Sequence, residues 1–299
     1  MNQVLIANNA CDQTGPGNNL ADCDNSGQNF IDEITQTNAA TGDLFTDFFQ
    51  DNDAAYSQVL DLNNNCDETT FVITSENNEA SCDSLAGNFI GQISQLNAAI
   101  GQFDALIDQD NNAFVTQNLV ADNTCDGTAL NTAGCTNFEA ENVIDGITQS
   151  NSADNVLDAS SVQLNNAVVD QNMGLINDCD ETELGLNDAG CAMIEPTNFV
   201  GDITQSSSNG AGAEADGATV DQLNDAQVNQ VFGAVNNCDE AGIGDNTAVL
   251  CSILGGNFVD SLTQVNSASV GDDFVQNNLV AISQNVQQTN DCDELGDGA

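Results

Sequence analysis

Cysteine is the residue whose spacing in this chain first indicates chemistry. The sequence has 11 cysteines, and all but Cys292 form couples that lie close together: Cys11/Cys23, Cys66/Cys82, Cys125/Cys135, Cys179/Cys191 and Cys238/Cys251. Cysteines that bind zinc usually recur with CxxC-type spacing, which this sequence lacks. The couples therefore predict five local disulfides and a secreted protein, extracellular or at the cell surface. Buried, reduced thiols in a cytosolic protein are the alternative.

Acid pairs form the second pattern, because they directly follow most of the cysteines that open a couple. The candidate metal ligands are Asp67, Glu68, Asp180, Glu181, Asp239 and Glu240, and the pair recurs once more at Asp293 and Glu294. Carboxylate oxygens beside a turn are ligands that Ca²⁺ and other hard cations prefer. One hypothesis is a Ca²⁺ site between repeats, and no other cofactor is predicted. The alternative is a solvated turn that keeps the surface soluble.

The charge of the chain excludes most classes of function. There are 47 Asp and Glu residues but no Lys, Arg or His, so the formal net charge is -47 at pH 7. Nucleic acid is excluded as a partner, since phosphate binding depends on Lys and Arg. Nucleophiles that need a histidine base or a lysine amine are excluded as well. Only paired carboxylates remain for catalysis, and active sites usually need mixed charge. We predict that the protein is not an enzyme.

The cysteines that open the couples recur at regular intervals, which indicates an internal repeat. They stand at positions 11, 66, 125, 179, 238 and 292, so the steps are 55, 59, 54, 59 and 54 residues. The chain therefore divides into a partial repeat (residues 1–10), five repeats (11–65, 66–124, 125–178, 179–237 and 238–291) and a second partial repeat (292–299). No apolar run approaches the ~20 residues of a membrane helix, so we predict no insertion into a membrane.

Two polar blocks recur within each repeat. The first has the form NF(I/V)xx(I/L)(T/S)Q and stands at Asn29–Gln36, Asn88–Gln95, Asn198–Gln205 and Asn257–Gln264, with a variant at Asn142–Gln149. Most copies continue as QxNxA. The second block places Gln, Asn, Ala and a larger apolar residue two positions apart before the next cysteine, as in Gln109, Asn111, Ala113 and Val115.

A step of two residues puts the matched side chains on one face of a β-strand. Stacked copies would then align Gln with Gln and Asn with Asn in hydrogen-bonded ladders. The expected fold is all-β, a β-solenoid or related stacked-strand repeat of about five disulfide-clipped units of ~57 residues. One alternative is a helical repeat, because Phe89, Ile93, Leu96 and Ile100 follow a heptad spacing. A row of small β-sandwich modules is another.

The QxNxA runs, such as Gln95-Asn97-Ala99, resemble curlin-type repeats, the β-solenoid units of extracellular amyloid fibres. The resemblance covers two stretches of each repeat. It differs from the curlin pattern in repeat length, in the spacing of Gln and Asn, and in the presence of cysteines. It implies a similar architecture and a fibre-forming role.

The ends of the sequence cut the repeat at corresponding places. Gln3 and Asn9 precede Cys11 with the offsets that Gln230 and Asn236 have before Cys238. We therefore expect a structural subunit of an extracellular filament or surface assembly, a homopolymer that joins head to tail through unfinished repeats. One hypothesis bonds Cys292 to a neighbouring subunit. The main alternative is a monomeric repetitive adhesin or a surface protein that binds divalent cations.

Overall fold

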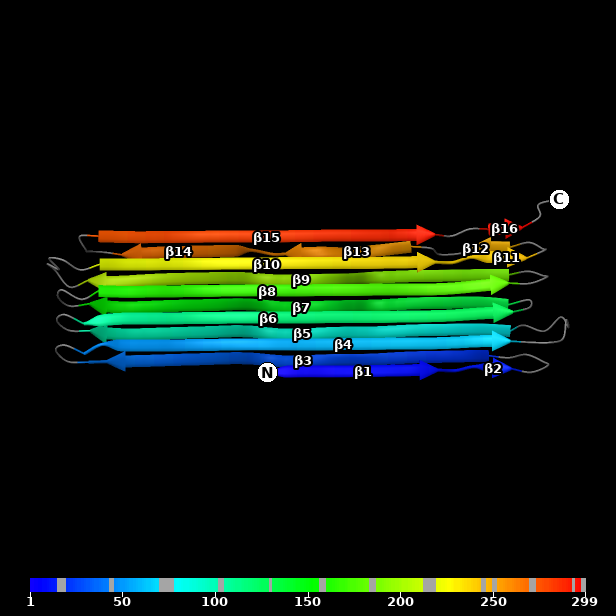
Figure 1. Ribbon diagram of the computed structural model, residues 1–299, viewed down its shortest axis with the longest axis horizontal. Coiled ribbons are helices and arrows are strands. Elements are labelled where there is room, and N and C mark those ends of the chain that lie inside the picture. Colours follow the sequence, from blue (N-terminus) through cyan, green and yellow to red (C-terminus); the bar gives the residue numbers. More distant parts are fainter. Residues whose placement is uncertain are drawn as a thin grey trace.

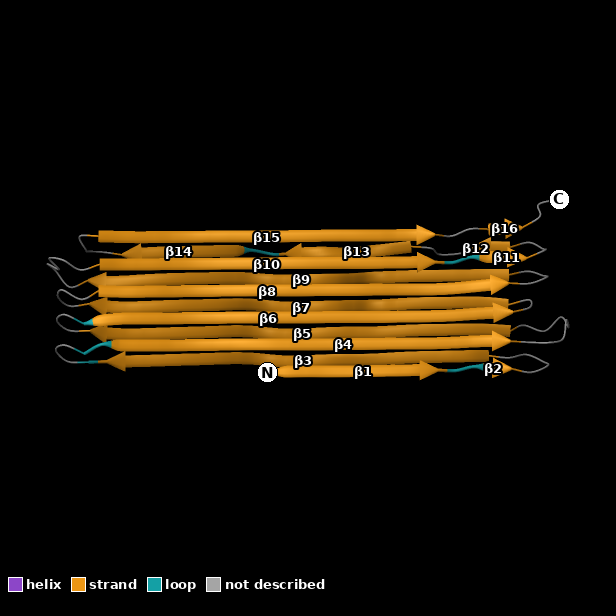
Figure 2. Cartoon of the chain, in the orientation of Figure 1, coloured by secondary structure: helices purple, strands orange, loops and turns teal. Residues whose placement is uncertain are grey.

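The computed structural model describes most of the chain as two parallel β-sheets that face each other. The described residues are 1–14, 20–42, 46–69, 78–101, 105–128, 131–155, 160–182, 187–211, 219–242, 246–248, 252–268, 273–291 and 294–296. The long strands alternate between the two sheets along the chain and stack into an all-β solenoid, as the sequence predicts (Figures 1 and 2). These residues contain no helix, and both sheets run continuously across the repeats. The helical and β-sandwich alternatives are therefore wrong.

The first sheet, called sheet A, has six principal positions in the order β1, β4, β6, β8, β10 and β15. Its strands are β1 (Asn2–Ala10), β4 (Phe48–Thr69), β6 (Leu106–Thr128), β8 (Ser160–Thr182), β10 (Thr219–Asn237) and β15 (Asp273–Asp291). Three short strands extend it: β2 (Gln13–Thr14), β11 (Glu240–Gly242) and β16 (Glu294–Gly296).

The second sheet, sheet B, has the order β3, β5, β7 and β9, followed by three shorter strands that all pair with β9. Its strands are β3 (Leu20–Thr41), β5 (Asn78–Gly101), β7 (Asn131–Asn155), β9 (Asn187–Ala211), β12 (Asn246–Ala248), β13 (Ser252–Val259) and β14 (Leu262–Ala268). One turn of the solenoid thus consists of one long strand from each sheet. A strand of 22 residues, such as β4, spans roughly 75 Å.

Neighbouring strands pair in a register that aligns equivalent residues of successive repeats. Gln50 lies beside Gln109, and Cys66 lies beside Cys125. The offset is 59 residues between β4 and β6 but 54 between β6 and β8, and equivalent residues still align. The unequal steps of the repeat are therefore accommodated outside the paired strands.

The NF(I/V)xx(I/L)(T/S)Q block contains a local change of phase in sheet B. In β5, Asn88 and Ile90 face the interior, and so do Ile93 and Gln95. Two consecutive residues between them, Gly91 and Gln92, face outward. This explains why the block contains a three-residue step between its apolar positions, whereas the rest of the strand alternates with a period of two.

A β-bulge interrupts the register of sheet B at a second place. The pairing of β5 with β7 shifts between Leu85 and Gly87, where β7 contains one extra residue. Glu139 in β7 and Glu195 in β9 have φ values of 42° and 54° there. Left-handed backbone is unusual for glutamate, and it accommodates the extra residue as in other bulges.

The interior alternates between apolar clusters and buried amides along the strand direction. One cluster contains Ile, Val and Ala side chains such as Ile144 and Val169, a second contains cysteines, and a third contains Leu, Met, Phe and Ala side chains. A small fourth cluster surrounds Ile107. In the third cluster sheet A mainly supplies large residues and sheet B smaller ones, so Leu119 faces a layer that contains Ala86 and Ala140. This size complementarity keeps the two sheets closely packed.

Candidate functional site

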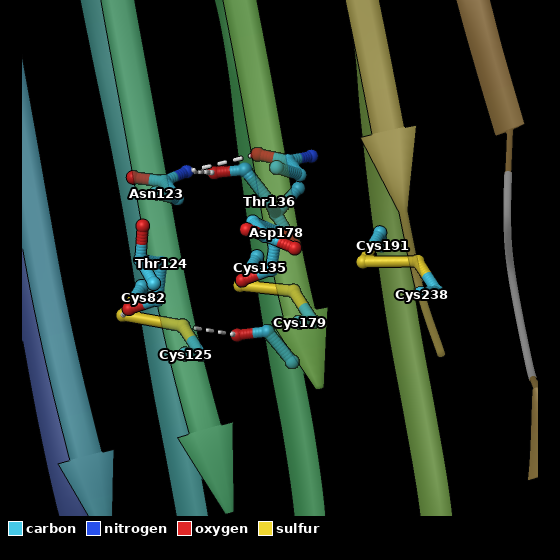
Figure 3. Close-up of a disulfide and its surroundings, with 12 residues drawn as sticks. Cys82, Asn123, Thr124, Cys125, Cys135, Thr136, Asp178, Cys179, Cys191 and Cys238 are labelled. Atoms are coloured by element: carbon cyan, nitrogen blue, oxygen red, sulfur yellow. Dashed lines mark hydrogen bonds between the residues drawn. A yellow bond between two sulfur atoms is a disulfide. The ribbon is translucent and has the colours of Figure 1, made fainter. Parts of the chain in front are cut away.

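The cysteines form one buried column that runs through the stack. Cys23, Cys66, Cys82, Cys125, Cys135, Cys179, Cys191 and Cys238 are each at most 1% exposed and belong to one cluster. Cys11 packs against its end. The column forms because, among the described cysteines, Cys66, Cys125 and Cys179 lie on strands of sheet A and Cys23, Cys82, Cys135 and Cys191 lie opposite on strands of sheet B. Figure 3 shows part of the column between the two sheets.

Among the described cysteines, four disulfides connect this column, and most of their partners differ from the predicted ones. Cys11 bonds to Cys23 as expected. The other three bonds join the second cysteine of one couple to the first cysteine of the next: Cys82–Cys125, Cys135–Cys179 and Cys191–Cys238 (Figure 3). The predicted pairs Cys66/Cys82, Cys125/Cys135, Cys179/Cys191 and Cys238/Cys251 are therefore wrong.

The physical reason for the different pairing is the stacking of the two sheets. Cys82 lies in one group with both Cys66 and Cys125, whose sulfur atoms are all within 4.8 Å of one another. A cysteine of sheet B thus reaches the sheet A cysteine on either side, and sequence distance does not decide between them. The Cys66 thiol donates to the carbonyl oxygen of Ser81 at 3.5 Å. Cys251 and Cys292 lie outside the described residues.

The predicted metal ligands lie in a row beside this column, at the outer end of the strands of sheet A. Asp67 pairs with Asp126, and Asp126 pairs with Asp180. The side chains of Asp67, Glu68, Glu181 and Glu240 lie outside the described part of the molecule. Among the described residues, only groups of cysteines bring three ligand atoms within 4.8 Å of one another. The acid row is therefore an alignment of single carboxylates, and Ca²⁺ binding stays a prediction.

Burial and nearby carboxylates change the protonation of one residue of the acid row, Asp180. Burial, together with the negative charges of Asp178, Asp126 and Asp239, raises the pKa of Asp180 to about 6. One buried oxygen of Asp180 and one of Asp239 have no hydrogen-bond partner. A second acidic group on the outer face of sheet A behaves similarly. Burial and the charges of Asp108, Asp51 and Asp53 raise the pKa of Asp110 to about 6.

The largest polar feature is a set of buried amide ladders, which we define as columns of stacked Gln or Asn side chains. In sheet A, one ladder contains Gln3, Gln58, Gln117, Gln171, Gln230 and Gln284, and another contains Asn9, Asn64, Asn123, Asn177, Asn236 and Asn290. In sheet B, Gln36, Gln95, Gln149, Gln205 and Gln264 form an equivalent ladder. The interior members are 0–1% exposed.

Every interior glutamine donates toward the N-terminal end of the stack. Gln117 Nε2 donates to Gln58 Oε1 at 2.9 Å, and Gln171 Nε2 donates to Gln117 Oε1 at 2.8 Å. The ladder in sheet B has the same direction, since Gln149 Nε2 donates to Gln95 Oε1 at 2.8 Å. Glutamine ladders are therefore polar columns with one donor end and one acceptor end.

Asparagine ladders have the opposite direction. Asn64 Nδ2 donates to Asn123 Oδ1 at 3.0 Å, and Asn123 Nδ2 donates to Asn177 Oδ1 at 3.2 Å. In sheet B, Asn142 Nδ2 donates to Asn198 Oδ1 at 2.9 Å. Each end of the stack therefore presents donors in one kind of ladder and acceptors in the other.

The edge strands of sheet A differ from the inner strands in charge. β4, β6 and β8 carry acidic residues along their length, for example Asp51, Asp122 and Asp170. In contrast, β1 has no acidic residue, and β15 has only Asp273 and Asp291 at its two ends. No described strand pairs with the outer edge of β15. Natural edge strands are usually protected by charge, so this uncharged edge is unusual.

The sequence indicated the ladders and the row of acids, but neither the direction of the ladders nor the uncharged edge was predicted. The acid-free stretch from Phe274 to Asn290 is visible in the sequence and could have indicated the second feature. Searches with this chain found no matching family model, no matching curated protein and no matching solved structure. Among the described residues, no helical segment has the length and apolar character needed to cross a bilayer.

Proposed function

We propose that this protein is a structural subunit of an extracellular filament, in which copies stack end on end as a homopolymer. The observation that carries the proposal is the state of the ladders at the two ends of the described stack. Interior amides such as Gln117 bond to neighbours on both sides, whereas Gln284 bonds within its ladder to Gln230 only. A further strand with the same pattern would satisfy the remaining amide atoms.

The charge distribution supports the same surfaces. Association of two chains with 47 acidic residues each is opposed by repulsion, because no cation is present in the side chains. The repulsion is weakest where strands with few acids meet: β1 has none, and β15 has acids only at its two ends. We expect acid, salt or a divalent cation to favour assembly by neutralising or screening the remaining carboxylates.

The disulfides support an extracellular setting, because such bonds persist in oxidising compartments. A mechanical role also fits the composition of the core, where amide ladders connect every turn of the solenoid to the next. The resemblance of the QxNxA runs to curlin-type repeats implies the same kind of fibre. Catalysis and nucleic-acid binding have no part in the proposed function.

The second candidate is a monomeric adhesin or a surface protein that binds divalent cations. The row formed by Asp126, Asp180 and Asp239 favours it, because two of these residues have a buried oxygen without a hydrogen-bond partner. A cation beside this row would lower the repulsion between the carboxylates.

Negative-stain electron microscopy of the native, non-reduced protein distinguishes these functions. The protein is examined across a range of concentrations at pH 4 and pH 7, with and without salt and Ca²⁺. We expect unbranched filaments, with the greatest length where the carboxylates are protonated or screened. Dispersed particles under all these conditions would rule out the filament and favour the monomeric alternative.

A further inference from the structure

We propose that copies of this chain join only head to tail, with the outer edge of β1 of one copy against the outer edge of β15 of another. This inference rests on the proposed function and specifies its interface. The partner is a second copy of the same chain. The basis is the fixed polarity of the glutamine and asparagine ladders: each ladder continues, donor to acceptor, into a ladder of the same residue type only where a β1 edge meets a β15 edge.

At the β15 edge, glutamine is an acceptor and asparagine is a donor. Gln284 Nε2 is used inside the molecule, because it donates to Gln230 Oε1 at 2.7 Å. Its Oε1 atom is left for a neighbour. Asn290 has the reverse arrangement, since its Oδ1 atom accepts from Asn236 Nδ2 at 3.2 Å. Its Nδ2 atom is left to donate outward.

At the β1 edge, the roles are exchanged. Gln3 Oε1 accepts from Gln58 Nε2 at 2.8 Å, so the next bond of this ladder must be donated by Gln3 Nε2. Asn9 Nδ2 donates to the carbonyl oxygen of Asp24 at 2.8 Å, as Asn64 Nδ2 does to that of Asp83 at 3.0 Å, so by the pattern of the inner turns Asn9 Oδ1 is the atom that would accept from a further strand. A β1 edge placed on a β15 edge thus pairs a donor with an acceptor in both ladders.

Backbone carbonyl groups determine the direction of each ladder. Gln117 Nε2 also donates to the carbonyl oxygens of Asn88 at 3.1 Å and Val143 at 3.0 Å. A carbonyl oxygen only accepts, so the amide atom that faces it must be nitrogen. Rotating one amide by 180° would place oxygen against oxygen at these contacts. The polarity is therefore a property of the fold and is repeated at every turn.

The contact between β1 of one copy and β15 of another, which we call the joint, has a register that follows from the strand pairing inside the molecule. Gln3 and Asn9 are six residues apart, as are Gln284 and Asn290. Inside the molecule, β1 pairs with β4 in parallel, with Gln3 beside Gln58 and Asn9 beside Asn64. The same parallel arrangement on β15 places Gln3 beside Gln284 and Asn9 beside Asn290, so both ladders continue across the joint.

A head-to-head contact fails these requirements. A twofold axis perpendicular to the sheet makes two β15 edges antiparallel, which sets Gln284 against an equivalent acceptor or against the shorter Asn290 side chain. A twofold axis along the strands turns their inner faces to opposite sides. In neither case does a ladder continue into a ladder of the same residue type. The head-to-tail contact is heterologous and does not close on itself, and it therefore produces a filament instead of a dimer.

The joint is made in sheet A alone. Asn25 Nδ2 contacts the carbonyl oxygens of Ala7 and Asn63, which places β3 between the levels of β1 and β4. Asn257 Nδ2 likewise contacts the carbonyl oxygens of Gln230 and Asn285, which places β13 between β10 and β15. Among the described strands, none of sheet B therefore lies at the level of a contact between β15 and β1. Filaments are expected to break there and not within a subunit.

The test uses two variants that each remove one outward donor. Gln3→Glu keeps the acceptor for Gln58 but cannot donate to Gln284 of another copy. Asn290→Asp keeps the acceptor for Asn236 but cannot donate to Asn9. Asn9→Asp and Gln284→Glu are the matched controls, because they add the same charge to the same strands and keep the outward acceptor. Circular dichroism verifies that each variant folds.

Sedimentation velocity and electron microscopy then give the polarity of assembly. Gln3→Glu and Asn290→Asp should each raise the critical concentration for filaments by roughly tenfold to a hundredfold, the effect of a lost donor at a buried acceptor. The controls should assemble nearly as the parent does. Mixing the two variants should give dimers and no filaments, because each still has one intact edge.

Three results would overturn the inference. Dimers of Gln3→Glu alone would indicate a head-to-head contact through β15. Equal effects of Gln3→Glu and Asn9→Asp would mean that charge and not ladder direction controls the joint. In both cases filaments of the parent protein would leave the proposed function intact. Absence of filaments of the parent under every condition would remove the proposed function together with this inference.

Discussion

Gln171 and Gln284 belong to the same ladder of sheet A, but their surroundings differ. Gln171 is fully buried, donates to Gln117, and accepts from Gln230. It also donates to the carbonyl oxygens of Asn142 and Phe199 in sheet B. Gln284 is exposed and makes only the bond to Gln230 within the ladder. An interior glutamine thus forms ladder hydrogen bonds on both sides, whereas the glutamine at the edge forms one on a single side.

The backbone around these two residues differs in charge as well as in burial. Inner strands carry carboxylates on their outward face, as Asp170 does one residue before Gln171. The residues around Gln284 are uncharged from Phe274 to Asn290. Inner turns therefore combine a bonded interior with a charged exterior, which favours a soluble, stable unit. The β15 edge has neither property, and this is the basis for assigning it to assembly.

The largest expected effect comes from removing an interior amide. Gln171→Met keeps the volume of the side chain but leaves Gln117 Oε1 without its donor, leaves Gln230 Nε2 without its ladder acceptor, and removes the side-chain donor to two backbone carbonyl groups. We expect the free energy of unfolding to fall by about 3–5 kcal/mol, since each buried unsatisfied group costs about 1–3 kcal/mol. Urea denaturation followed by circular dichroism measures the change.

Gln284→Met is the matched control for this comparison. It removes a single bond at an exposed position, so we expect a loss of at most about 1 kcal/mol. A similar loss in both variants would mean that the ladders contribute to stability equally along the stack, and the contrast between interior and edge would be incorrect.

The next effect concerns the cysteine column, where the disulfides close chain segments of different length. Cys135–Cys179 spans 44 residues, whereas Cys11–Cys23 spans 12. Loop-closure entropy predicts a loss of about 4 kcal/mol when the longer link is replaced by alanines and about 3 kcal/mol for the shorter link. Urea denaturation of the two double variants, Cys135→Ala/Cys179→Ala and Cys11→Ala/Cys23→Ala, tests this order.

Disulfide mapping checks the pairing on which this prediction depends. Trypsin has no site in the chain, because Lys and Arg are absent, so an Asp- and Glu-specific protease is used before mass spectrometry. We expect linked peptides that contain Cys82 with Cys125 and Cys135 with Cys179. Linked Cys125 and Cys135 would instead support the pairing of neighbours in sequence.

Much of the fold could be predicted from the sequence because the repeat and the hydrophobic pattern agree. The two-residue steps at Gln109, Asn111 and Ala113 place these side chains on one face, and all three are fully buried. Equivalent residues then align in register, since a shift by one residue would turn the amides outward. The β-solenoid and its ladders follow from local pattern alone.

The features that were missed depend on how one sheet meets the other. Cys82 lies between Cys66 and Cys125, and only the stacking of the sheets determines which one it bonds. The direction of each ladder is likewise determined by carbonyl groups of the facing strand, such as those of Asn88 and Val143 opposite Gln117. A single sequence records the residues of such contacts but not their partners.

A smaller effect is expected at the acid row. The pKa of Asp180 and that of Asp110 are about 6 in the folded protein, against about 3.9 in an unfolded chain. A raised carboxyl pKa means that ionisation opposes folding. Stability should therefore rise as the pH falls from 7 through about 6, and the gain should be complete near pH 4. Thermal unfolding between pH 4 and pH 8 measures this trend.

Asp180→Asn tests the assignment of this trend to the acid row. The amide removes one charge beside Asp126 and Asp239 and offers a donor to their carboxylates. We expect a gain of about 1 kcal/mol at pH 7, because solvent screens a partly exposed group, and almost no change at pH 4. Asp273→Asn, at an exposed position on β15, is the control. An equal gain in both would indicate a general effect of net charge.

The smallest effect is expected at the β-bulge of sheet B, where β7 has one residue more than β5 and the regular alternation of the strand is interrupted. Glu139 has a φ of 42°, which costs a residue with a side chain about 1–2 kcal/mol and glycine almost nothing. Its charge also helps to raise the pKa of Glu141.

Glu139→Gln removes the charge alone, whereas Glu139→Gly removes the charge and the backbone strain. We expect Glu139→Gly to be more stable than Glu139→Gln by about 0.5–1 kcal/mol, after the flexibility of glycine in the unfolded chain is included. Urea denaturation of the two variants gives this difference directly. If Glu139→Gly is the less stable variant, the bulge is held without strain, and the left-handed residue is a tolerated part of the strand.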